Sequence, residues 1–196
     1  AEKGYEDPSL VDISSQAEAN KAAINYHFQS KDNLYAIAWR TAFENSLAAH
    51  PMTGGIPADA PAEERLYGHI LSLGRRALST EGYEFTIMEK ERANPTGLLK
   101  EILHKSILPV LKQLQSIVAE LLGPQAKTEH LRLCQGSIMS QCWHIFRNQR
   151  PDGCHPHPPL KLNIEEIAQH ITQFSLAGIR DMRDRIEHGD SSKRGR

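Results

Sequence analysis

Apolar residues recur at spacings of three and four along most of this chain, with almost no alternation of apolar and polar positions. A spacing of three and four is the period of an amphipathic helix, whereas alternation would indicate strands. The pattern therefore predicts an all-α protein. The expected helices cover residues 10–16, 20–28, 31–49, 62–79, 84–92, 96–122, 128–148 and 164–187.

Polar residues mark the starts of the first three helices. Ser9 and Asp12 have the spacing of a capping box, in which each side chain bonds the other residue's backbone amide. Asn20 and Ser30 are expected to cap the next two helices, because their side chains accept hydrogen bonds from first-turn amides. Because its own cap is Asn20 and the next cap is Ser30, the second helix must be short.

The longest periodic stretch, residues 96–122, has two neighbouring apolar stripes. So wide an apolar face indicates a helix surrounded by others. Pro109 removes one backbone donor inside it, and we expect a bend over residues 105–109. Gly123 and Pro124 should end the helix.

Proline and glycine gather at residues 51–61 and 151–159. The first group separates a short N-terminal part from a longer helical part, and we place the domain boundary there. We expect a helix-turn-helix domain over residues 1–49 and an antiparallel helical bundle over residues 50–196, which would carry ligand binding and dimerisation.

Composition adds mainly exclusions. The 196 residues are 39% hydrophobic, enough for a core, and the net charge of −1 gives no overall basic signature. No apolar run reaches the roughly 18–20 residues that span a bilayer, so no membrane partner is expected, and no signal peptide is visible. Three cysteines fit a reducing cytoplasm better than a disulfide scaffold.

Residues 19–35 are the most informative stretch for function. A short helix, an abrupt break and a long helix form the second half of a helix-turn-helix, whose second helix enters the major groove of DNA. Ile24 and Phe28 should face inward, which leaves a small, polar outer face suited to phosphates and base edges. The candidate DNA-binding residues are Ser9, Asn20, Lys21, Ala22, Asn25, Tyr26, His27 and Lys31. The alternative is that they are ordinary exposed helix residues, and for His27 that it packs on the next helix.

The same region resembles the TetR/AcrR family of bacterial transcription regulators. The resemblance rests on Gly4-Tyr5, Asp12-Ile13, Ala17, Tyr26-His27-Phe28 and Ser30-Lys31-Asp32-Asn33-Leu34. Residues 22–28 look like the CecR-like branch in particular. The resemblance implies a homodimeric repressor that binds a double-stranded DNA operator and is released by a small-molecule inducer.

The family pattern differs from this chain in two respects. The family places a helix before Gly4, so we expect that the first helix of the DNA-binding domain is missing from this sequence. Many members carry a tyrosine where Asn25 stands, which affects the base contacts rather than the fold.

The net acidic charge of the N-terminal part supports an alternative to DNA binding. Residues 1–50 contain four basic and seven acidic side chains, although phosphate neutralisation supplies much of the affinity for DNA. A helical dimeric module that binds a small molecule or a protein, without DNA, therefore remains open. No catalytic motif or phosphate loop occurs, so neither an enzyme nor a cofactor is expected.

Two further sets of candidates lie in the longer part. Soft and aromatic side chains could line an apolar ligand pocket, although each could simply be core. These are Met88, Arg92, Leu99, Leu103, His104, Met139, Cys142, Trp143, His144 and Phe146. Helices 128–148 and 164–187 could pair across a twofold axis, or bury the same stripe within one subunit. The dimer candidates are Ile138, Ile145, Ile167, Ile171, Phe174, Gly178 and Met182.

Cys154, His155 and His157 raise the question of a metal site. A closed tetrahedral site needs three or four ligands, and no second ligand pair stands at a familiar spacing. We therefore expect an exposed loop there and no metal.

Overall fold

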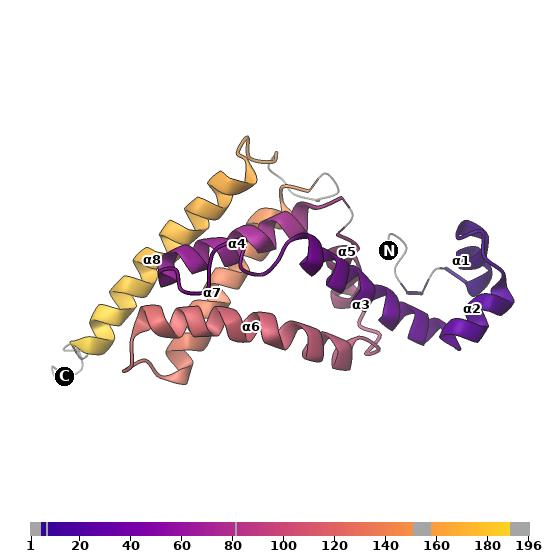
Figure 1. The fold of residues 1–196 in the computed structure, drawn as a ribbon, viewed down its shortest axis with the longest axis horizontal. Helices are drawn as coiled ribbons and strands as arrows, with labels where there is room; N and C mark the ends of the chain where they lie inside the picture. The colour runs from indigo at the N-terminus through magenta and orange to yellow at the C-terminus, as the bar shows by residue number, and fades with distance from the viewer. Residues whose placement is uncertain (1–4, 7, 81, 151–157, 189–196) are drawn as a thin grey trace. The chain divides into compact units, whose positions relative to one another are not determined.

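The computed structural model describes residues 5–6, 8–80, 82–150 and 158–188, and in this part every regular element is a helix (Figure 1). The all-α prediction is confirmed. The helices are α1 (Leu10–Gln16), α2 (Lys21–Phe28), α3 (Lys31–Ala49), α4 (Ala62–Leu78), α5 (Tyr83–Ala93), α6 (Lys100–Leu122), α7 (Thr128–Arg147) and α8 (Ile164–Glu187).

These helices form two compact units. Unit 1 comprises residues 1–49 and 80–108, and unit 2 comprises residues 50–79 and 109–196. One edge of the division coincides with the boundary expected after residue 49. The other falls inside α6, between Leu108 and Pro109, so that this single helix belongs to both units.

The start of α6 differs from the prediction. The helix begins at Lys100 rather than near residue 96, because the amide and hydroxyl of Thr96 bond the Glu91 carboxylate and Gly97 has a positive φ of 77°. Further along, the backbone stays helical across Pro109, and the bend expected there remains a prediction. Gly123, with φ 83°, ends the helix as expected.

Unit 1 is built on α3. Trp39 is fully buried in it and stacks on Phe43, with ring centroids 5.1 Å apart. Helix α5 packs against α3, and there the Ser46 hydroxyl donates to the buried Glu84 carboxylate at 3.2 Å. The first two helices attach to the other end of α3 through contacts of α1 with α2 and of α2 with α3.

Unit 2 is a helical bundle in which α4 packs on both α7 and α8. Small residues set two of its close contacts. A Cβ on Gly74 would lie 2.5 Å from the Phe146 ring, and a Cβ on Gly68 would lie 2.2 Å from the Thr53 carbonyl oxygen. Each of the two apolar stripes predicted for α6 contributes buried residues, for example Leu114 from one and Val118 from the other.

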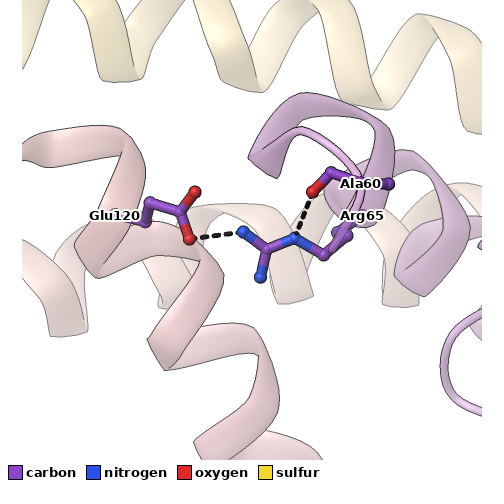
Figure 2. Close-up of polar contacts among 3 residues, drawn as sticks. All are labelled: Ala60, Arg65 and Glu120. Carbon is purple, nitrogen blue, oxygen red and sulfur yellow. Dashed lines mark hydrogen bonds and ion pairs between the residues drawn. The ribbon is translucent and has the colours of Figure 1, made fainter. Parts of the chain in front are cut away.

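Arg65 ties the start of α4 to the end of α6 (Figure 2). Its Nε donates to the Ala60 carbonyl at 2.8 Å, and one terminal nitrogen pairs with Glu120. The ion pair is partly open to solvent, so its contribution to stability is small. Its geometric effect is to fix the turn that precedes α4.

Candidate functional site

Helices α1 and α2 start at the predicted caps. The Ser9 hydroxyl accepts from the Asp12 amide at 3.2 Å, and the Ser9 amide donates to the Asp12 carboxylate at 2.8 Å, which completes the capping box. Asn20 Oδ1 accepts from the Ala22 amide at 2.8 Å. Both candidate side chains thus hold helix ends, although Ser9 and Asn20 are themselves exposed.

Helix α2 has one buried side and one open side. Ile24 is buried and Phe28 is half-buried, which is the orientation expected from their spacing. Lys21, Ala22, Asn25, Tyr26 and His27 are all exposed. Tyr26 is 82% exposed, an unusual state for so large an aromatic side chain, and its ring meets the His27 ring edge-on at 5.3 Å. His27 therefore packs on its neighbour within α2.

The break after α2 is sharp. Gln29 adopts a positive φ of 64°, and its amide donates to the Asn25 carbonyl at 2.9 Å. Ser30 then caps α3 as predicted, since its hydroxyl accepts from the Asn33 amide at 3.1 Å. The Asn33 side chain donates back to the Phe28 carbonyl at 3.0 Å. These bonds fix the angle between α2 and α3.

Lys31 lies at the first position of α3 and is half-buried. Its ammonium stands 4.4 Å from the centre of the Tyr5 ring and donates to the Glu6 carbonyl at 3.3 Å. The Tyr5 hydroxyl donates to Asp32 at 2.5 Å, and this bond raises the pKa of Tyr5. Because an ammonium has three donors, Lys31 can hold these contacts and still bind an anion.

The ten ligand-pocket candidates are divided between the units. Met88, Arg92, Leu99, Leu103 and His104 belong to unit 1, and the other five, all on α7, belong to unit 2. Three of the ten are essentially inaccessible: Leu99, Cys142 and Phe146. Burial raises the pKa of the Cys142 thiol to about 12, so this cysteine is an apolar core group. Met139 and Trp143 are half-buried.

Unit 2 also contains features that the sequence reading missed. Pockets of about 370 and 190 Å³ lie beside the first turn of α4, and neither is lined by a candidate residue. His69 and Arg76 are buried on α4. Burial, with a contribution from the Arg76 charge, lowers the pKa of His69 to about 4. Both positions lie on the inward, apolar side of α4, and this placement was the sequence signal from which their burial could have been predicted.

The dimer candidates separate into two groups. Ile138, Ile167 and Ile171 are buried within the single chain, so they form the core of unit 2 and cannot present a surface to a partner. Ile145 and Met182 are half-buried. Phe174 is 65% exposed, and a Cβ added to Gly178 would meet no atom within 4 Å.

The loop considered for metal binding, with Cys154, His155 and His157, lies outside the described residues. Among residues that are described, no group of three or more histidine, cysteine or acidic side chains could hold a metal ion. No helix in the same part is both long and apolar enough to cross a membrane.

Comparisons with known proteins agree with the helix-turn-helix geometry. Residues 62–179 match the family model described as the C-terminal domain of the HTH-type transcriptional dual regulator CecR, and residues 1–37 match that of bacterial regulatory proteins of the tetR family. No curated protein matches the chain.

A solved structure shares the fold. The crystal structure of the TetR family transcriptional regulator PfmR from Thermus thermophilus superposes with a TM-score of 0.61 at 23% identity. The match covers 88% of this chain and 90% of that one. The chain belongs to the TetR family of transcriptional regulators, with a helix-turn-helix DNA-binding region and a CecR-type C-terminal domain.

Proposed function

We propose that α2 is the helix that enters the major groove of an operator. The observation that carries this proposal is the open face of α2, where small and polar side chains surround the 82% exposed Tyr26 while Ile24 is buried. Ala22 permits close approach of the backbone, and the Asn25 amide is suited to adenine. Lys21 and Tyr26 are suited to phosphate oxygens.

Lys31 is proposed as the main phosphate anchor. It starts α3, where first-turn amides also favour an anion, and the Tyr5 ring and Glu6 carbonyl hold its ammonium in place. Ser9 and Asn20 are proposed to act through the ends of the helices they cap, which bring backbone amides toward the DNA backbone. His27 has a supporting role beside Tyr26.

The regulator is proposed to act as a homodimeric repressor. Residues 1–49 would carry DNA binding, and residues 50–196 would carry ligand binding and dimerisation. Two α2 helices would engage half-sites roughly 34–36 Å apart. An inducer bound in unit 2, near the half-buried Met139 and Trp143, would favour a state that releases DNA. No enzymatic step enters this mechanism.

The proposal is tested by DNA binding of the full chain. The probes are a duplex from the intergenic region beside its gene and a random duplex of equal length, each titrated at several salt concentrations. Lys31→Ala should weaken both complexes and reduce the slope of log affinity against log salt by about 1 per anchor lost. Asn25→Ala should weaken the intergenic complex roughly 5- to 150-fold and leave the random one almost unchanged.

Matched controls are available in exposed positions. Lys112→Ala and Asn45→Ala remove the same side chains from α6 and α3, and should leave both complexes intact. Similar losses on both duplexes for Lys31→Ala and Asn25→Ala would overturn the division between anchoring and base reading. Absence of binding by the unsubstituted chain at low salt would contradict DNA binding itself.

A further inference from the structure

Glu91 is a buried carboxylate that joins two segments of unit 1. It lies near the end of α5 and is 8% exposed. On one side it accepts from the Tyr35 hydroxyl of α3 at 3.3 Å. On the other it accepts from the Thr96 hydroxyl at 2.9 Å and from the Thr96 and Gly97 amides at 3.0 and 3.1 Å. One side chain thus connects α3 with the turn that precedes α6.

Tyr35 extends the connection toward the DNA-binding end of α3. Its ring lies 5.3 Å from the ring of Tyr5. Tyr5 in turn lies beneath the Lys31 ammonium and donates its hydroxyl to Asp32. The contacts are continuous from the Thr96–Gly97 turn to Lys31, and every member belongs to unit 1.

The Tyr35–Glu91 bond persists across the physiological pH range. Burial, reinforced by the negative charge of Glu91, raises the pKa of Tyr35 to about 12. The hydroxyl therefore stays protonated and remains a donor. A donor bonded to a charged acceptor contributes more than a neutral pair does, and its loss would leave the carboxylate bonded to the turn but no longer to Tyr35 of α3.

We propose that Glu91 and Tyr35 are positioning residues for Lys31, which couple the Thr96–Gly97 turn to phosphate binding through the Tyr5 ring. The inference rests on the proposed role of Lys31 as phosphate anchor. The Thr96–Gly97 turn is also connected along the chain to unit 2, because α6 begins three residues after Gly97 and continues into unit 2. A displacement of α6 along its axis would act on this turn, and the coupling must operate equally in the reverse direction.

A double-mutant cycle with the intergenic duplex tests the proposal. Tyr35→Phe removes only the hydroxyl and keeps the ring beside Tyr5. It should weaken binding roughly three- to tenfold and lower the salt slope toward that of Lys31→Ala. In the Lys31→Ala background, Tyr35→Phe should have no further effect, because its target is already gone. Hydrogen exchange at the Thr96 and Gly97 amides should slow when DNA binds, and this slowing should disappear in Tyr35→Phe.

Controls separate positioning from stability. Tyr83→Phe removes the same hydroxyl from a 54% exposed position on α5 and should change nothing. Glu91→Gln should reproduce the lowered salt slope, whereas simple destabilisation lowers the folded fraction and leaves that slope unchanged. Equal losses from Tyr35→Phe in both backgrounds would overturn the coupling. A normal salt slope in Lys31→Ala would instead overturn the anchoring role on which it rests.

Discussion

His69 makes unit 2 sensitive to acid. It is 3% exposed, its Nδ1 has no hydrogen-bond partner among the described residues, and the buried Arg76 adds positive charge nearby. The pKa of His69 is about 4 in the folded chain, against 6.5 for an ordinary histidine. The unfolded chain therefore binds the proton first as the pH falls. The contribution of neutral His69 to the free energy of unfolding is fully present above pH 6.5 and is lost as the pH falls toward 4. The loss should approach about 3 kcal/mol.

Urea unfolding between pH 4 and pH 7.5 measures this effect. His69→Gln cannot take up the proton, so the free energy of unfolding should fall less with acid than in the unsubstituted chain. His170→Gln, an exposed histidine on α8, should keep the full dependence. An unchanged pH dependence in His69→Gln would show that other groups cause the acid sensitivity.

Single residues were predictable from the sequence where their role is local. Ser9, Asn20 and Ser30 cap their helices as expected, because a cap bonds amides two or three positions away. Glu91 and His69 were not recognised, because their roles depend on which helices pack together. A polar side chain on an amphipathic helix gives no local sign that a distant segment will bury it.

At the scale of elements, Gly68 controls how the 51–56 loop meets α4. Alanine would ordinarily favour a helix by roughly 1 kcal/mol over glycine. A Cβ at Gly68, however, would lie 2.2 Å from the Thr53 carbonyl oxygen and 2.7 Å from the Ile56 side chain. The loop would have to move, so Gly68→Ala should destabilise the chain by about 1–3 kcal/mol in urea unfolding.

Gly136 supplies the matched control for this prediction. It lies on α7 with no atom within 4 Å of an added Cβ. Gly136→Ala should therefore stabilise the chain by roughly 0.5–1 kcal/mol. A stabilising effect of both substitutions would mean that the loop does not rest on Gly68.

The helix bounds match the prediction to within one or two residues where capping residues, prolines or glycines coincide with the ends of the apolar period. The exception is α6, which begins at Lys100. Residues 96–99 continue the apolar period, but the bonds from Thr96 and Gly97 to Glu91 hold the backbone in a turn instead. Short-range bonds to a buried carboxylate five and six residues earlier outweighed helix preference at this position, and apolar periodicity gives no sign of them.

At the scale of the whole molecule, the proposed dimer would use the outer faces of α7 and α8. Phe174 and Leu133 are 65% and 63% exposed, and Gly178 leaves open space where a side chain would stand. Exposed apolar residues beside small ones permit close approach of two helices. The sequence predicted these helices for dimerisation, but it could not say which apolar residues the chain buries for itself.

Phe174→Asp tests the dimer and its link to DNA binding together. Because Phe174 is mostly exposed, an aspartate there should leave the fold intact while placing two charges in an apolar contact. Sedimentation velocity should show monomers, and affinity for the intergenic duplex should fall by roughly a hundredfold or more, since the second half-site then binds independently. Leu160→Asp introduces the same charge at a 54% exposed position outside both helices and should remain dimeric. A dimer that survives Phe174→Asp would place the interface elsewhere, whereas a monomer with full affinity would separate assembly from operator binding.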